Sequence, residues 1–378
     1  DNGSLVAFNK GLDEEAGFRI LGTHSDSPSL KIKPNADIYE KEFHKLGVEI
    51  YGGAQLEPWF DRELSLAGRV CYLTTDGNLK IEFVDFNRPI AVIPSIALHL
   101  NKNSGQDNPL NPQKHIVPII GLHKEQKKSF NEILTDHLTI EHKNLHLQQI
   151  LSYDLFFYDF RKPGYAGIDN EFILSARLDN QLSCFLAATV AASADKNHNF
   201  LIICNDHEEI GSKTASGAEG NMLTSFFERI YPDSRQRFTI LAKSFLISVD
   251  NAHATHPNYS NKHDSSHEIF LNKGPVLKIN ANQRYATSSP SSAVFKLLCS
   301  EVDIQAQDFV MPNDMPCGST LGPMTAAKVG LKTVDIGAAT LAMHSVREMT
   351  GRHDPYLLYK VLHHFFTRQH IPEVRQNA

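Results

Sequence analysis

The sequence predicts an α/β protein in which helices flank a mixed sheet and an antiparallel β domain is inserted into the chain. Between about residues 35 and 160, short alternating runs are separated by Gly- and Asn-rich turns, which is typical of antiparallel strands. After about residue 163, apolar strands alternate with helical segments, which is typical of a sheet covered by helices. The 378 residues exceed the usual size of one core, so two domains are expected, residues 1–32 with 163–378 and residues 33–162.

The elements follow from the apolar runs and the turns between them. A short strand at 18–22 leads into His24 and Asp26, and Pro28 and Pro34 follow it. In the inserted domain, alternating runs predict strands at 48–51, 64–72 and 79–83. Parallel strands of the main sheet are expected at 201–204, 245–249, 309–311 and 333–336. Helices are expected after Asp179, Ser288, Gly318 and Asp354.

The composition is that of an ordinary globular protein, with 41% hydrophobic and 21% charged residues. Its 37 basic and 43 acidic side chains leave a net charge of −6, so neither nucleic acid nor an anionic membrane surface is an expected partner. The chain has no apolar run near the roughly 20 residues that a membrane helix needs, and no signal region opens it. Five scattered cysteines without a Cys-x-x-Cys pair indicate reduced thiols in a cytoplasmic protein.

Two adjacent carboxylates, Glu208 and Glu209, follow the apolar run 200–205, which predicts a buried strand. In a doubly wound sheet, catalytic groups collect just beyond the carboxyl ends of the strands. A Glu pair there can divide two tasks, one side chain binding a metal ion and the other accepting a proton from water. Alone, the pair is weak evidence, because most such pairs are solvated surface.

Four further segments bring His or Asp to the end of an apolar run, and together they favour a metal hydrolase. Two neighbouring divalent ions need imidazole and carboxylate ligands, one of which touches both ions. The residues that fit this need are His24, Asp179, Glu209, Asp250 and His344. Nitrogen and oxygen donors without thiolate suit Zn²⁺, and also Mn²⁺ or Co²⁺.

Two other acidic residues have expected roles around these ligands. Glu208 is the predicted general base. Asp26 lies two residues after His24 on the same face of the strand, so it is expected to orient that imidazole from behind.

Each candidate also has an ordinary structural interpretation. His24 alone could be a hydrogen-bonded histidine at a strand end, and Asp179 could cap a helix. Asp250 could equally end a strand, and His344 is one of 19 histidines. The metal prediction therefore depends on the whole set occurring together.

The segments around these residues resemble the aspartyl aminopeptidase family, whose members are co-catalytic dizinc exopeptidases. The resemblance spans almost the whole chain. It is carried by HSDSP at 24–28, ARLDN at 176–180, DHEEIGS at 206–212, DNAH at 250–253, HPNY at 256–259, GPVLKIN at 274–280, NQRY at 282–285 and AMHSVRE at 342–348. Further matches are YGGA at 51–54, WFDRELSLAGR at 59–69 and PCGSTLGP at 316–323. The resemblance implies a zinc-exopeptidase-like fold.

The resemblance also implies a role for each matching residue, with two Zn²⁺ per chain. Asp179 would bridge both ions. His24 and Asp250 would complete one site, and Glu209 and His344 the other. Glu208 would be the base. Residues that match substrate-contacting positions are His253, Lys278, Tyr285 and His99, the last of which the inserted domain would lend to a neighbouring subunit.

The expected substrates are peptides with acidic N-termini. A preference for Asp or Glu needs a cation in the first pocket, for which Lys278 is the candidate. The family resemblance further implies that the inserted domain forms dimers and that dimers build a tetrahedral dodecamer. It also implies a bacterial-type member that lacks its N-terminal segment, since the chain opens in a turn that runs straight into a strand.

Two alternatives stay open at this point. A related dizinc enzyme could hydrolyse N-acyl amino acids, and a protein with a degenerate site could serve only in assembly. The long resemblance argues against the first, and the intact set of five ligands with Glu208 argues against the second.

Overall fold

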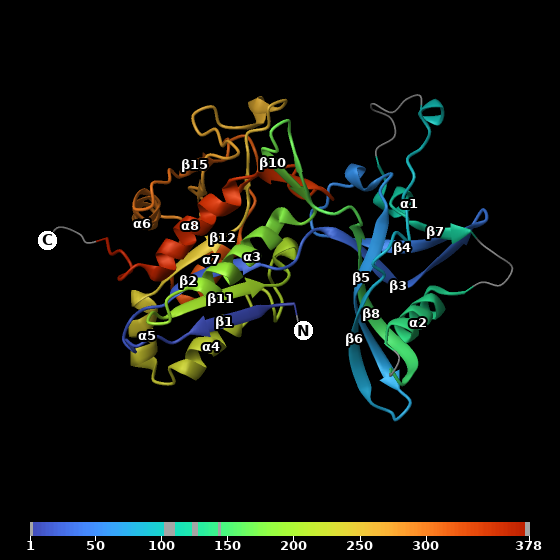
Figure 1. Cartoon of the computed structure of the whole chain (residues 1–378), viewed down its shortest axis with the longest axis horizontal. Coiled ribbons are helices and arrows are strands. Elements are labelled where there is room, and N and C mark those ends of the chain that lie inside the picture. The colour runs from blue at the N-terminus through green and yellow to red at the C-terminus, as the bar shows by residue number, and fades with distance from the viewer. Residues whose placement is uncertain (1–2, 102–109, 123–127, 143–144, 375–378) are drawn as a thin grey trace. The chain divides into compact units, whose positions relative to one another are not determined.

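The computed structural model describes residues 3–101, 110–122, 128–142 and 145–374 (Figure 1). The chain divides into two compact units. The first consists of residues 1–27, 163–343 and 348–378, and the second of residues 28–162 with 344–347. None of the helices in these described ranges is long and apolar enough to cross a membrane.

A seven-stranded mixed sheet forms the centre of the first unit, in the order β1-β11-β2-β12-β16-β14-β15. Its strands are β1 (Leu5–Asn9), β11 (Phe200–Asn205), β2 (Arg19–His24), β12 (Phe245–Val249), β16 (Lys332–Gly337), β14 (Val276–Ile279) and β15 (Gln307–Val310). β11, β2, β12 and β16 run parallel to one another, and β1 runs antiparallel at one edge. Every residue of β11, β2 and β12 is buried, as expected for strands covered on both faces. The predicted mixed α/β sheet is confirmed.

The direction of one predicted strand is wrong. β15 contains most of the run at 309–311 and is parallel to β14, but β14 is antiparallel to β16. The pair β14 and β15 therefore runs against the four parallel strands. The chain reaches β14 through a long loop from β13 (Ala252–His253), a strand outside this sheet, so no helical crossover fixes the direction of β14 relative to β12.

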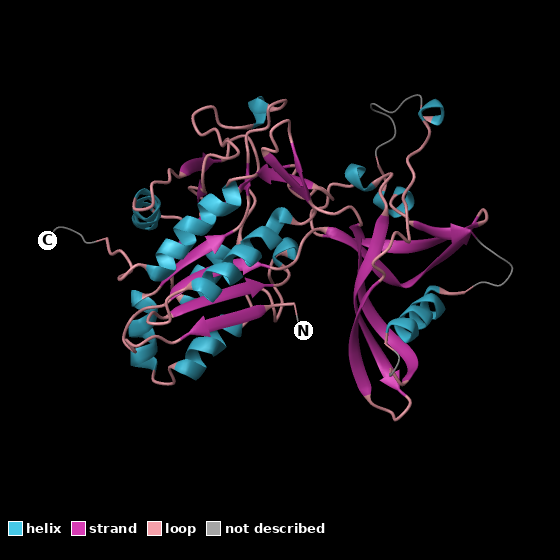
Figure 2. Cartoon of the chain, in the orientation of Figure 1, coloured by secondary structure: helices cyan, strands magenta, loops and turns pink. Residues whose placement is uncertain are grey.

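Helices cover both faces of this sheet (Figure 2). Because strand side chains alternate in direction, Leu21 packs into one hydrophobic cluster with helix residues such as Leu186, and its neighbour Ile20 packs into another with Phe227. The first face carries α3 (Leu178–Ser193), α6 (Ser289–Ser300) and α8 (Asp354–Thr367). The other carries α4 (Met222–Ile230), α5 (Ser234–Lys243) and the end of α7 (Leu321–Val329). The helices predicted after Asp179, Ser288, Gly318 and Asp354 are confirmed as α3, α6, α7 and α8.

A smaller five-stranded sheet completes the first unit, in the order β13-β17-β18-β10-β9. The strands other than β13 are β17 (Ala339–Leu341), β18 (Glu348–Gly351), β10 (Phe172–Ser175) and β9 (Gly164–Ala166). β10 precedes α3 and pairs with β18, so this sheet supports the start of α3.

The second unit is built on a six-stranded antiparallel sheet, in the order β6-β5-β8-β3-β4-β7. Its strands are β3 (Ser29–Glu40), β4 (Phe43–Tyr51), β5 (Leu64–Thr74), β6 (Leu79–Asp85), β7 (Ile119–Leu122) and β8 (Leu147–Asp159). α2 (Phe130–Glu141) packs Leu134 and Leu138 into a core with Leu66 and Phe157. A short helix, α1 (Pro112–His115), precedes β7. The predicted role of this unit in dimerisation stays a prediction.

Candidate metal centre

Three neighbouring parallel strands, β11, β2 and β12, end at the same edge of the main sheet. His24 is the last residue of β2 and lies in register with Asn205, the last residue of β11. Glu208 follows β11 after a two-residue turn, and Asp250 directly follows β12. The carboxyl ends of parallel strands are where doubly wound sheets bind their ligands. Side chains separated by more than 200 residues in the sequence therefore lie together.

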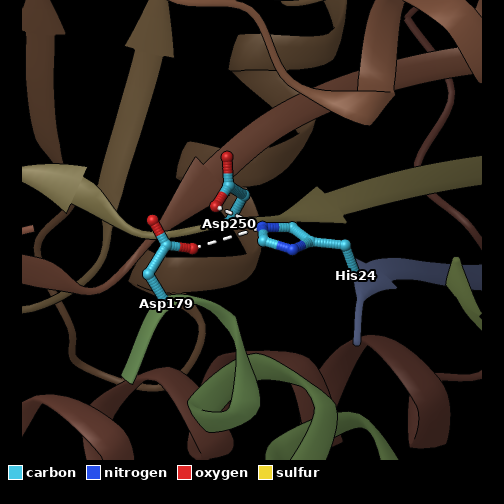
Figure 3. A group of neighbouring side chains, drawn as sticks. All are labelled: His24, Asp179 and Asp250. Carbon is cyan, nitrogen blue, oxygen red and sulfur yellow. Dashed lines mark hydrogen bonds and ion pairs between the residues drawn. The ribbon is translucent and has the colours of Figure 1, made fainter. Parts of the chain in front are cut away.

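The first cluster consists of one imidazole and two carboxylates (Figure 3). The Nε2 atom of His24 lies 3.2 Å from Oδ1 of Asp179 and 3.3 Å from Oδ1 of Asp250. The exposed fractions are only 1% for His24, 3% for Asp179 and 8% for Asp250. The potential ligand atoms of the three residues all lie within 4.8 Å of one another.

A second cluster shares His24 with the first. The potential ligand atoms of His24, Glu208 and Glu209 also lie within 4.8 Å of one another, and both glutamates are half-buried. The short 3-10 helix Glu208–Ile210 presents the two carboxylates, and His207 before it adopts the left-handed conformation, with φ of 63°. The turn after β11 thus brings the Glu pair back to the imidazole at the end of β2.

Asp26 lies behind His24, on the Nδ1 side of the ring. Its backbone oxygen lies 3.1 Å from Nδ1, and its carboxylate oxygen Oδ1 lies 3.4 Å from the same atom. A proton on Nδ1 would leave the lone pair of Nε2 directed at Asp179 and Asp250. The same carboxylate accepts hydrogen bonds from the backbone N–H groups of Glu208 and Glu209, both at 3.1 Å, a contact that spacing in the sequence did not predict. Asp26 therefore contacts His24, which belongs to both clusters, and the backbone of the Glu pair in the second cluster.

Asp179 lies at the start of α3, where its backbone is not helical, with φ of −84° and ψ of 107°. The peptide bond that joins it to Asn180 is cis. Asn180 donates a hydrogen bond from Nδ2 to the backbone oxygen of Val249, the residue before Asp250, at 2.8 Å. Asn180 therefore connects two of the predicted ligand segments, a role that the sequence analysis missed because an Asn beside a helix start has many ordinary explanations.

The pKa values of two residues reflect this crowded, buried arrangement. Burial opposes protonation of His24, but hydrogen bonds to Asp179, Asp250 and Asp26 outweigh it and raise the pKa of His24 well above its ordinary value. Burial raises the pKa of Glu208 to about 7; His24 opposes that shift, and the carboxylates of Asp250, Asp179 and Asp26 reinforce it. A cluster that gathers this many carboxylates around one imidazole favours a bound cation.

The predicted substrate residues of the first unit gather beside Asp250. The Nζ atom of Lys278 lies 3.1 Å from Oδ2 of Asp250 and 5.5 Å from the centre of the Tyr285 ring. Tyr285 and His253 both lie beside Phe309, with ring centres 6.3 and 6.1 Å from that ring. Lys278 and Tyr285 are buried, whereas His253 is exposed. Burial has the largest effect on the pKa of Tyr285 and raises it, and the hydrogen bond with Cys317 raises it further. The hydroxyl of Tyr285 therefore stays protonated at neutral pH.

The two remaining predicted residues belong to the second unit. His344 lies in the segment 344–347, where its Nδ1 atom is 3.2 Å from the backbone oxygen of Gly53. His99 lies in the short 3-10 helix Leu98–Leu100 and is exposed. The ligand role of His344 and the substrate role of His99 stay predictions.

The donor chemistry of the first unit fits zinc. One imidazole nitrogen and several carboxylate oxygens, without a thiolate, form a borderline-hard set that Zn²⁺ accepts. The hydrogen bond from the second ring nitrogen of His24 to Asp26 is the usual arrangement behind a metal-binding histidine.

Comparisons with known proteins agree with this chemistry. Residues 1–366 match the family model described as aminopeptidase I zinc metalloprotease (M18). A "probable M18 family aminopeptidase 2" of Pseudomonas syringae pv. tomato is 44% identical over 375 residues, covering 98% of this chain and 87% of that protein. The protein of the same name from Pseudomonas entomophila is 45% identical with the same coverage.

Solved structures extend the likeness to the whole fold. A chain in the cryo-EM structure of the Ape4 and Nbr1 complex is 37% identical, with a TM-score of 0.90, covering 96% of this chain and 74% of that one. The S. cerevisiae mApe1 dodecamer is 27% identical, with a TM-score of 0.80 over 97% of this chain and 84% of that one.

Proposed function

The chain belongs to the M18 family of zinc metalloproteases and is a metalloaminopeptidase, and on that premise we propose that it removes N-terminal Asp or Glu from peptides with a two-metal centre and Glu208 as the base. The observation that carries the proposal is the buried cluster of His24, Asp179 and Asp250 with the Glu pair beside it. Membership in a peptidase family favours peptides over N-acyl amino acids, and argues against a purely structural assembly protein.

The proposed ligands divide between two ions. His24 and Asp250 would hold one ion, Glu209 and His344 the other, and Asp179 would contact both. When bound, zinc supplies Lewis acidity that polarises the scissile carbonyl and acidifies water. The imidazole of His24 would bind through Nε2, because its Nδ1 atom faces Asp26.

Glu208 is the proposed proton carrier. Its carboxylate accepts a proton from the attacking water and then delivers it to the nitrogen of the departing peptide, so the group returns to its starting state. Its backbone is held by Asp26, and its half-buried carboxylate lies beside His24, which fits a base that acts next to the metal ligands. Zinc would thus supply the Lewis acid, and the contacts of the protein itself would hold the base in place.

Substrate selection is proposed to involve Lys278, which contacts Asp250 of the metal cluster, together with Tyr285 and His253. A carboxylate such as Asp250 or Glu208 would receive the free α-amino group of the peptide. A carboxylate at the first side chain of the substrate would be attracted to the ammonium group of Lys278. Since Lys278 already contacts Asp250, the same cation would link the metal cluster to the side-chain pocket.

A peptide panel tests this function. Zinc-loaded protein is expected to release the first residue from Asp- and Glu-initiated peptides faster than from a matched Leu-initiated peptide, and not to cleave an N-acetylated Asp peptide. Mass spectrometry of the products measures both. Equal rates for Asp and Leu would contradict the acidic preference, and cleavage of the acetylated peptide would contradict the aminopeptidase mechanism.

Replacing Lys278 with Met is expected to lower kcat/KM for Asp- and Glu-initiated peptides about 10- to 100-fold more than for the Leu-initiated peptide, because a charge-assisted hydrogen bond is lost. Lys296→Met is the matched control, since Lys296 pairs with Asp308 on the surface. Equal losses on all peptides would instead assign Lys278 to holding Asp250, with no part in selectivity.

The proposed assembly is a tetrahedral dodecamer built from dimers that form through the second unit, with His99 reaching a neighbouring site. Support comes from the likeness to the mApe1 dodecamer. The mass of the protein in solution, measured by light scattering, checks it: the mass of twelve chains is expected, and a lone chain would contradict it.

A further inference from the structure

Glu348 is a buried carboxylate directly beside the start of α3. It is the first residue of β18, only 1% of it is exposed, and it lies in register with Ser175 on β10. Its Oε2 atom accepts a hydrogen bond from the backbone N–H of Asp179 at 2.8 Å. The two residues are 169 positions apart in the sequence, so only the fold brings them together.

The backbone of Asp179 needs such a partner. The first N–H groups of a helix have no acceptor within the helix, and Arg177, the residue before α3, makes no side-chain capping bond. A carboxylate makes a stronger hydrogen bond to an N–H group than a neutral acceptor does, and burial removes the competing water. Glu348 therefore holds the peptide on the N-terminal side of Asp179.

Ser27 holds the peptide on the other side. Its hydroxyl donates a hydrogen bond to the backbone oxygen of Asp179 at 2.7 Å. With both peptide groups held, the position of the Asp179 carboxylate depends only on its own short side chain. That carboxylate lies 3.2 Å from Nε2 of His24, at the centre of the metal cluster.

We propose that Glu348 is a positioning residue for the metal centre, which fixes the carboxylate of Asp179 through a hydrogen bond to its backbone. The inference rests on the proposed metal-binding role of Asp179. Side chains that orient metal ligands change metal affinity about 10- to 100-fold when they are replaced. A residue that served only to stabilise β18 would change the stability of the protein and leave its affinity for metal unchanged.

Two substitutions separate the effect of the length of the Glu348 side chain from the effect of its charge. Glu348→Gln keeps the length and a carbonyl acceptor but removes the charge, whereas Glu348→Asp keeps the charge but withdraws the acceptor by one methylene group. Glu171→Ala is the control, because the Glu171 carboxylate also accepts a backbone N–H, that of Asp169 at 3.1 Å, outside the metal cluster.

The readouts are the dissociation constant for Zn²⁺, from competition with a chelator, and the visible absorption of the Co²⁺-loaded protein. We expect Glu348→Asp to weaken metal binding about 10- to 100-fold and to alter the Co²⁺ spectrum. Glu348→Gln is expected to remain within a few-fold of the unsubstituted protein, and Glu171→Ala to match it.

Unchanged affinity and spectrum in Glu348→Asp would overturn the inference. If Glu348→Asp does not fold, Glu348→Ala is measured in its place, with the same expected loss of metal affinity and the same contradicting result. Failure of the unsubstituted protein to bind metal would contradict the proposed function itself, so the two failures are distinguishable.

Discussion

Replacing Glu208 with Gln is expected to lower kcat for Asp- and Glu-initiated peptides by about 10²- to 10⁴-fold, the usual contribution of a general base. The amide keeps the shape of the side chain but cannot accept the proton of the attacking water. Because Asp26 holds this turn through the backbone N–H groups of Glu208 and Glu209, the substitution leaves the turn anchored. Steady-state kinetics of the zinc-loaded variant measure the effect.

The metal content of this variant has to be measured alongside its activity. Zinc bound per chain is expected to match the unsubstituted protein, because Glu208 is not among the proposed ligands. Glu228→Gln, on the exposed face of α4, is the matched control and should retain full kcat. A Glu208→Gln protein that keeps its zinc and most of its kcat would remove Glu208 from the role of base.

Replacing His24 with Ala is expected to abolish zinc binding at one site and to lower kcat/KM by about 10³-fold or more, since metal polarisation supplies several kcal/mol. His24 belongs to both clusters of the first unit, so its loss affects both of them. Its loss also leaves the carboxylates of Asp26, Asp179 and Asp250 without the imidazole between them. Elemental analysis after dialysis against a weak chelator measures the zinc that remains.

A matched histidine controls for non-specific loss. His353 is exposed at the start of α8 and makes no side-chain capping bond, so His353→Ala should retain both zinc and activity. Full zinc content in His24→Ala would contradict the assignment of His24 as a ligand, whatever happens to the rate.

The strand ends of the site could be predicted from the sequence because the apolar runs are short and well bounded. The runs at 200–205 and 245–249 end directly before polar residues. A strand that is buried on both faces is recognised by a continuous apolar run, without alternation of apolar and polar residues. Since parallel strands end at one edge, His24, Glu208 and Asp250 were expected together, and the structure brings them together.

The residues behind the ligands could not be predicted in the same way. Glu348 and Ser27 act through the backbone of Asp179, and a contact to a backbone group leaves no spacing or pattern in the sequence. The reversed direction of β15 was missed because the run at 276–279 was not predicted as a strand, and because the alternation of strands and helices does not record the direction in which the chain re-enters the sheet. Lys278 was expected as a cation in the substrate pocket. Its ion pair with Asp250 could not be predicted, because it depends on the order of β12 and β14 in the sheet.

Diffraction from zinc-loaded crystals, recorded on both sides of the zinc absorption edge, tests the central claim most directly. The account predicts two anomalous peaks, one of them about 2.0–2.2 Å from Nε2 of His24 and from carboxylate oxygens of Asp179 and Asp250. A single peak beside His24 would contradict the two-metal centre, and zinc bound only elsewhere on the chain would contradict the site itself.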